Sequence, residues 1–136
     1  MKADTTETRT VVVEREMPHP PEKIWRALTQ SHLIEEWLMK NDFKPDMGRR
    51  FNFSADWGAV SGEVRTVVAD ETLSYSWETK DLTSVITWTL TPTATGTRLR
   101  MEQTGFRPDQ RSYYQGAVVG WKRFFASLEE VLARMD

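Results

Sequence analysis

The sequence predicts an α+β fold in which a curved antiparallel sheet wraps around one long C-terminal helix, in the order β-α-α-β-β-β-β-β-α. Two observations support this prediction. Between residues 49 and 103, apolar and polar residues alternate in short segments, as in antiparallel strands with one covered and one solvated face. The only long amphipathic element spans about residues 109–134 and is the expected cover for that sheet. A chain of 136 residues suits one domain, which we expect to span 9–136 after a frayed segment 1–8.

The first ordered elements are expected to be a strand and two short helices. Segment 9–17, RTVVVEREM, is rich in β-branched residues and predicts a strand. The prolines that follow end this strand, and Pro21 suits the first turn of a helix. Ser31 is the expected N-cap of a second short helix, which ends near Leu38.

Five strands are predicted next, at 49–56, 62–69, 72–79, 84–92 and 98–103. Because successive side chains point to opposite faces of a strand, parity directs one set toward the helix: Phe51, Phe53, Val64, Tyr75, Trp77, Ile86, Trp88, Met101 and Gln103. The other face carries Glu63, Arg65, Glu78, Arg100 and Glu102, which predict solvated cross-strand pairs. A β-bulge in any strand would reverse its parity and could turn an acid inward.

The terminal helix contains an unusual pair of glycines. Its apolar residues follow a helical spacing, yet Gly116 and Gly120 lie four residues apart among them, and Trp121 follows directly. A glycine inside a helix costs about 1 kcal/mol relative to alanine. Two interpretations remain open from the sequence. The glycines either permit close packing against a neighbouring element or leave room for a ligand.

Composition excludes several classes of function. The net charge is −2 and the positive residues do not cluster, so we expect no binding to nucleic acid. The absence of cysteine excludes disulfides and thiolate metal sites and fits a reducing compartment. No segment approaches the roughly 20 apolar residues of a membrane span, and none resembles a signal peptide. We therefore expect a cytoplasmic protein without membrane insertion.

Signals for catalysis and metal binding are weak. The two histidines are His19 and His32, and His32 with Glu36 would supply only two metal ligands. The sequence has no G-x-S-x-G segment, no phosphate-binding loop and no glycine-rich dinucleotide turn. We expect no catalytic residue, no metal site and no cofactor.

Several segments together resemble a known family. They are VEREMPHPPEKIWRALTQSHLIEEWL, GEVRTVVADETLSYSWE, VITWTLTPTATGTRLRMEQTGF and GWKRFFASLEEVL. In this order they are similar to the activator of heat-shock-protein-90 ATPase homologue-like (AHSA-like) family of the START/SRPBCC superfamily. The resemblance implies a helix-grip fold, a sheet gripping a long helix with a cavity between them. It also implies binding of lipids, polyketides or other hydrophobic molecules. Some members are cyclases or hydrolases, and the family name implies a chaperone or stress-response role.

We therefore expect an intracellular binding protein for a small, largely hydrophobic molecule in that cavity. Its walls would be the inward-facing strand residues given above, with Tyr75 and Gln103 orienting the ligand. Trp37 and Met39 are expected at the mouth, and the helix would add Gly120, Trp121 and Phe125. Two alternatives stay open: a chaperone co-factor or other protein-interaction domain, and a cyclase- or hydrolase-type enzyme that orients a flexible substrate. The protein would be a monomer or a homodimer.

Overall fold

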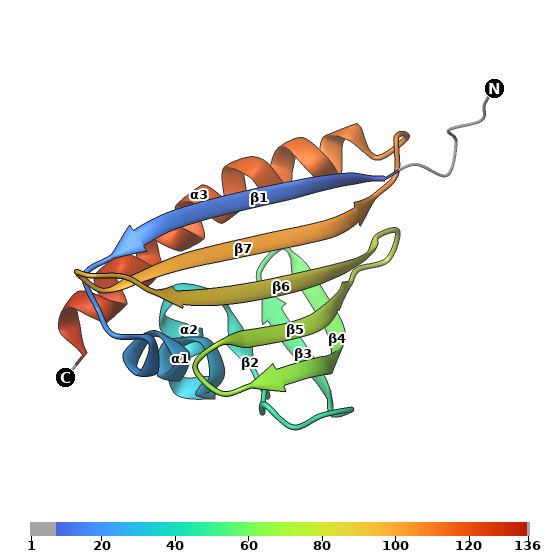
Figure 1. The fold of residues 1–136 in the computed structure, drawn as a ribbon. Coiled ribbons are helices and arrows are strands. Elements are labelled where there is room, and N and C mark those ends of the chain that lie inside the picture. Colours follow the sequence, from blue (N-terminus) through green and yellow to red (C-terminus); the bar gives the residue numbers. More distant parts are fainter. Residues whose placement is uncertain (1–7, 136) are drawn as a thin grey trace.

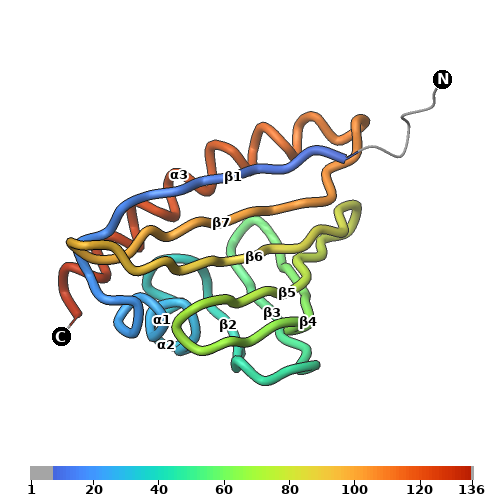
Figure 2. The backbone as a smooth tube through the Cα atoms, in the orientation of Figure 1, coloured from blue at the N-terminus to red at the C-terminus, as the bar shows by residue number. Residues whose placement is uncertain are grey.

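The computed structural model describes residues 8–135, and Figure 1 shows one curved antiparallel sheet with a long helix running along it. The elements in chain order are β1 (Arg9–Met17), α1 (Pro21–Thr29), α2 (Ser31–Trp37), β2 (Lys40–Asn41), β3 (Arg50–Ala55), β4 (Gly58–Val68), β5 (Thr72–Glu78), β6 (Thr83–Pro92), β7 (Thr97–Phe106) and α3 (Arg111–Arg134). The strands lie in the order β1-β7-β6-β5-β4-β3-β2, and every neighbouring pair is antiparallel. The backbone trace in Figure 2 follows the curve of the sheet from β1 round to β2.

The predicted α+β fold and order of elements are confirmed, with corrections at some boundaries. The structure adds the two-residue strand β2, and β4 begins at Gly58 rather than at residue 62. A short turn at Asp56 and Trp57 joins β3 to β4, and Gly58 follows it with a φ of 147°, a conformation that favours glycine. Ser31 is not an N-cap. Gln30 occupies that position, and the Ser31 hydroxyl instead donates to the Asn41 carbonyl oxygen at 3.0 Å.

Strand parity correctly identified the inward face of the sheet. All nine residues that we expected to face the helix are buried. The pairing of β4 with β5 shifts register between Val64 and Thr66. Val64, the one residue of β4 that was predicted to face the helix, comes before this shift, so the prediction for it is unaffected. Nearby, a Cβ at Gly62 would meet the Ser76 carbonyl oxygen at 2.1 Å, so close approach of two strands requires glycine there. The core therefore lies between this face of the sheet and the helices.

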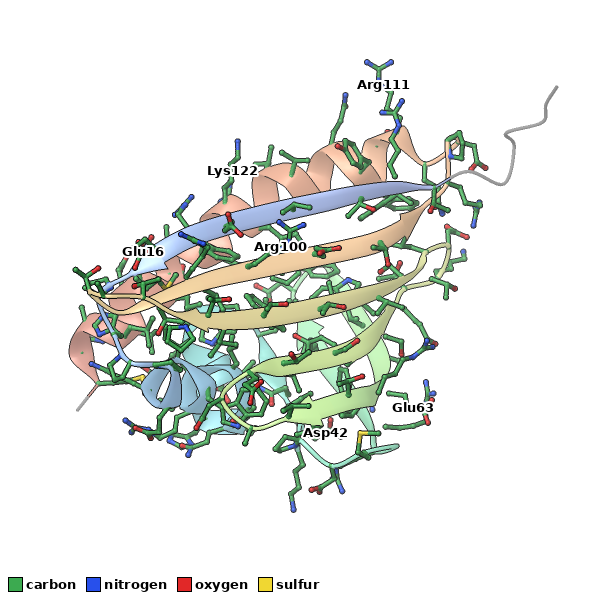
Figure 3. The ribbon with its side chains drawn as sticks, viewed as in Figure 1. Glu16, Asp42, Glu63, Arg100, Arg111 and Lys122 are labelled. Atoms are coloured by element: carbon green, nitrogen blue, oxygen red, sulfur yellow. The ribbon has the colours of Figure 1, made fainter. Side chains whose placement is uncertain are left out.

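The outer face of the sheet carries charged pairs between strands, as expected. Between strands, Arg100 lies 3.7 Å from Glu14 and Arg50 lies 3.7 Å from Glu78, while within β7 Arg100 also lies 3.0 Å from Glu102. Figure 3 shows Arg100 on this outer face and Glu63 directed away from the body of the protein. The bulge thus turns no acid from this set into the core.

The prediction of a frayed segment 1–8 lies outside the described residues, apart from Thr8. Across residues 8–135, no helix combines the length and the apolar character that crossing a membrane requires.

Candidate functional site

A pocket of about 790 Å³ lies between the first half of α3 and the nearby end of the sheet. The β3–β4 hairpin, the turn after β5, the end of β7 and α3 all contribute to its wall. The lining residues are Trp57, Gly58, Ala59, Trp77, Thr79, Lys80, Asp81, Leu82, Gln103, Phe106, Tyr113, Gly116, Ala117, Gly120, Trp121, Arg123 and Phe124. The pocket thus lies where the predicted cavity between sheet and C-terminal helix was expected.

The two glycines of α3 face open space. A Cβ built on Gly116 would meet no atom of another element within 4 Å, and one on Gly120 would meet only the Phe124 ring, at 4.0 Å. Close packing against a neighbouring element does not explain either glycine. The residues at positions 116, 120, 123 and 124 share one side of the helix, and all of them line the pocket. The missing side chains therefore enlarge the pocket.

A chain of buried hydrogen bonds supports the pocket floor. The Trp121 indole Nε1 donates to Gln103 Oε1 at 2.7 Å, and Gln103 Nε2 donates to the Ser84 hydroxyl at 3.0 Å. The Ser84 hydroxyl in turn donates to the Trp77 carbonyl oxygen at 2.8 Å. An indole N–H can only donate, so Trp121 fixes which end of the Gln103 amide faces it. Gln103, which is 2% exposed, is held in a single orientation at the pocket wall.

Aromatic rings form the apolar part of the wall. The centroids of the Trp77 and Trp121 rings lie 5.5 Å apart, and those of Trp121 and Phe124 lie 5.4 Å apart. Phe106 is fully buried at the end of β7 and packs edge-on against Tyr114. Trp77, Phe106, Trp121 and Phe124 thus form an aromatic lining suited to an apolar ligand.

These features, a long helix against a curved antiparallel sheet with a pocket between them, agree with a comparison against known families. The family model for the activator of Hsp90 ATPase homolog 1-like protein matches residues 18–133. The chain belongs to this family. The resemblance inferred from the sequence is thereby confirmed. A comparison with curated proteins finds no match.

Solved structures support the same fold for this AHSA-like chain. Protein MLL2253 from Mesorhizobium loti is 64% identical, with a TM-score of 0.92 over 94% of this chain and 99% of that one. Protein BH1534 from Bacillus halodurans is 22% identical, with a TM-score of 0.82 over 91% of this chain and 96% of that one. CalU16 from Micromonospora echinospora is 20% identical, with a TM-score of 0.79 over 93% and 78% of the two chains. The last two comparisons show the fold alone.

Four of the expected ligand contacts lie on the pocket wall of this AHSA-like domain: Trp77, Gln103, Gly120 and Trp121. The other ten are buried without lining the pocket: Trp37, Met39, Phe51, Phe53, Val64, Tyr75, Ile86, Trp88, Met101 and Phe125. Trp37 and Met39 are not at the mouth. The Trp37 indole donates to the Ala27 carbonyl oxygen at 2.8 Å, and its ring packs edge-on against Trp88.

Tyr75 belongs to the core and not to the pocket. Its ring packs against Phe43, Phe51 and Phe53, and its hydroxyl accepts a hydrogen bond from the Trp88 indole at 3.0 Å. Burial raises the pKa of the Tyr75 hydroxyl well above its usual value of 10.0, and the Trp88 hydrogen bond opposes this only in part. Tyr75 is thus a neutral core residue over the physiological pH range.

Sequence reasoning missed the rim of the pocket. Trp57, at the tip of the β3–β4 hairpin, is 64% exposed, and the short segment ADWGA was the signal for that turn. Asp81 accepts a hydrogen bond from the Tyr113 hydroxyl at 3.2 Å. This bond, reinforced by the negative charge of Asp81, raises the pKa of Tyr113. The Gln110 side chain donates to the Asp81 carbonyl oxygen, which ties the turn after β5 to the start of α3.

Among residues 8–135, no three histidine, aspartate or glutamate side chains gather as ligands for a metal ion. His32 is exposed, and Glu36 lies 3.2 Å from Arg134 in an ion pair.

Proposed function

We propose that this AHSA-like protein binds a small, largely hydrophobic molecule in the pocket beside Gly116 and Gly120. The open space in front of the two helical glycines carries the proposal. Each glycine costs the helix about 1 kcal/mol relative to alanine, and neither gains a packing contact in return. A volume of about 790 Å³ lies within the range of pockets for small organic ligands.

The wall supplies both the driving force and an orienting group. Apolar ligand surface that packs against Trp77, Trp121 and Phe124 leaves water, which contributes about 25 cal/mol for each Å² buried. The Gln103 amide carries two hydrogens, and within the described residues only Ser84 accepts one of them. The second hydrogen is the donor that the proposal assigns to a ligand oxygen.

Two other interpretations of the family remain predictions. They are a chaperone co-factor and a cyclase- or hydrolase-type enzyme, and the geometry of the pocket adds no observation that favours either. The cytoplasmic location likewise remains a prediction from composition.

The proposal is tested by looking for a bound molecule and then blocking its site. Protein purified without detergent would be weighed by native and denaturing mass spectrometry. It would then be screened by thermal shift against fatty acids, sterols, flavonoids and polyketides. We expect a bound mass or a saturable rise in melting temperature. Gly116→Leu should abolish the rise, because its side chain enters the open space.

The matched control is Val119→Leu, which enlarges a 58%-exposed residue of the same helix away from the pocket wall. This variant should bind as the original protein does. Absence of any bound mass and of any shift across the library would refute the proposal. Equal binding by Gly116→Leu and Val119→Leu would refute the assigned site.

A further inference from the structure

We propose that the pocket selects amphipathic anions, with the apolar body between the aromatic walls and one anionic group at the mouth, paired with Lys80 and Arg123. This inference rests on the proposed function and names the chemical class of its ligand. It adds a requirement that an apolar cavity alone does not impose, namely a single negative charge at one end of the molecule.

The two cations reach the pocket from different elements. Lys80 lies in the turn after β5, and Arg123 lies on α3, one helical turn after Gly120. Both residues are exposed, as expected of residues at a rim. They come to one pocket because the Gln110 side chain ties the β5–β6 turn to the start of α3.

Neither cation forms an ion pair with an acid of residues 8–135. Within residues 8–135, the arginines that form ion pairs are Arg15, Arg26, Arg50, Arg100, Arg107 and Arg134. Lys80 and Arg123 form none in that same part of the chain. An exposed cation keeps its hydration in the free protein, so it costs little to leave unpaired, and it gains an interaction only when an anion arrives.

The remaining charge on the wall is Asp81. Its carboxylate accepts a hydrogen bond from the hydroxyl of Tyr113, which lies on α3. The charged side chains of the lining are then two cations and one anion, a net positive rim on a chain whose net charge is −2. This local excess opposes the overall charge and favours an anionic ligand.

The floor and the rim impose different requirements on one molecule. The buried floor is aromatic, and the second Gln103 amide hydrogen is a neutral donor, so a charge placed there would lose its hydration without a counter-ion. At the rim, the Arg123 guanidinium offers a planar fork of donors that matches an oxyanion, and Lys80 offers a second positive charge. An anion at the mouth and an apolar body inside satisfy both.

Two fluorescent probes with the same aromatic body separate the inference from the proposed function. N-phenyl-1-naphthylamine is neutral, and 8-anilinonaphthalene-1-sulfonate carries one sulfonate on the same ring system. Each would be titrated into the original protein, Lys80→Gln, Arg123→Gln and the double variant. The matched control is Lys122→Gln, which removes a charge beside Arg123 from a side chain that projects away from the sheet and does not line the pocket (Figure 3).

We expect each single substitution to weaken sulfonate binding about threefold and the double variant to weaken it about tenfold, the modest effect of exposed ion pairs. Raising the salt concentration from about 20 mM to about 500 mM should weaken sulfonate binding by the original protein toward that of the double variant. Binding of the neutral probe should change with neither substitution nor salt. Lys122→Gln should bind both probes as the original protein does.

The outcomes distinguish the two claims. If the neutral probe shows no saturable binding, or binds Gly116→Leu as well as the original protein, the proposed function fails and the inference fails with it. If the neutral probe binds in the pocket but Lys80→Gln and Arg123→Gln leave sulfonate affinity unchanged, the inference alone is overturned. An equal loss in Lys122→Gln also overturns it, because the effect would then reflect overall charge and not the rim.

Discussion

The two halves of α3 lie against the same sheet, but the space between helix and sheet is filled along one half and open along the other. In the second half, Phe125, Leu128 and Leu132 are each 0% exposed and close the space completely. In the first half, Gly116 and Gly120 leave that space open, and the pocket lies in front of them. Both halves keep an apolar stripe of the same helical spacing. The size of the side chains on α3 therefore determines where the fold forms a packed core and where it forms a pocket.

The neighbouring elements reinforce this contrast. At the closed end, α1 and α2 pack against α3, and Trp88 stacks on Phe125 with ring centroids 5.7 Å apart. At the open end, the border is the tip of the β3–β4 hairpin, where Trp57 is largely exposed. The closed end is thus bordered by packed helices, and the open end by an exposed turn.

The largest expected effect compares two adjacent phenylalanines of α3. Phe125→Ala should lower the free energy of unfolding by about 3–5 kcal/mol, because it leaves a cavity in the closed end. Phe124 is half-buried at the pocket, so Phe124→Ala should cost less than half as much. Urea unfolding followed by circular dichroism measures both values. Should Phe125→Ala fail to fold, Phe125→Leu is compared with Phe124→Leu, and the loss of unfolding free energy should again be larger at position 125. Equal losses at the two positions would contradict the comparison.

A smaller effect is expected from Tyr75→Phe, which leaves the buried Trp88 indole without its acceptor and should cost about 1–3 kcal/mol at neutral pH. The Tyr75 pKa is raised in the folded state, so folding favours the protonated hydroxyl. That contribution is complete below the ordinary value of 10.0 and is lost as pH rises above it, because the unfolded chain then ionises first.

Urea unfolding at pH values from 8 to about 11, with tyrosinate absorbance recorded alongside, checks this prediction. The original protein should lose stability as the pH rises above 10.0, the ordinary pKa of a tyrosine. One of its three tyrosines should ionise only when the protein unfolds. Tyr75→Phe should lose less over the same interval. Ionisation of all three tyrosines in the folded protein at their ordinary pKa would contradict the burial of Tyr75.

The smallest effect sharpens the contrast among the glycines. Gly116→Ala should stabilise the protein by about 0.5–1 kcal/mol, because alanine favours the helix and its Cβ meets open space. Gly62→Ala should destabilise it, since that Cβ would overlap the Ser76 carbonyl oxygen. Thermal unfolding of both variants gives the signs. A destabilising Gly116→Ala would mean that α3 packs closely where the pocket is placed.

The alternation of the strands was sufficient to identify the core face, since burial of Phe51, Tyr75 and Met101 requires only the period of a strand. It could not divide that face between core and pocket, because the division depends on how far α3 lies from each strand. The glycines were ambiguous for a related reason. A sequence shows that Gly116 lacks a side chain but not what faces it.

The rim was beyond reach for a different reason. Lys80 and Arg123 meet at one pocket only because a turn and a helix are tied together by Gln110 and Asp81, residues 29 positions apart. Trp57 lies in the short turn between β3 and β4. The sequence predicted the second of these strands to begin only at residue 62, which placed Trp57 in a longer loop. Residues in turns are placed by tertiary contacts, which local patterns do not encode.

The central claim, that one end of the space under α3 is open and the other closed, is tested most directly by the indole N–H signals of the six tryptophans. After assignment by single substitutions, a two-dimensional ¹⁵N–¹H spectrum would be recorded during titration with N-phenyl-1-naphthylamine. We predict that Trp57, Trp77 and Trp121 shift with a common saturation curve, while Trp25, Trp37 and Trp88 remain in place. Equal shifts of Trp37 and Trp88, or no shift at Trp121, would contradict the account.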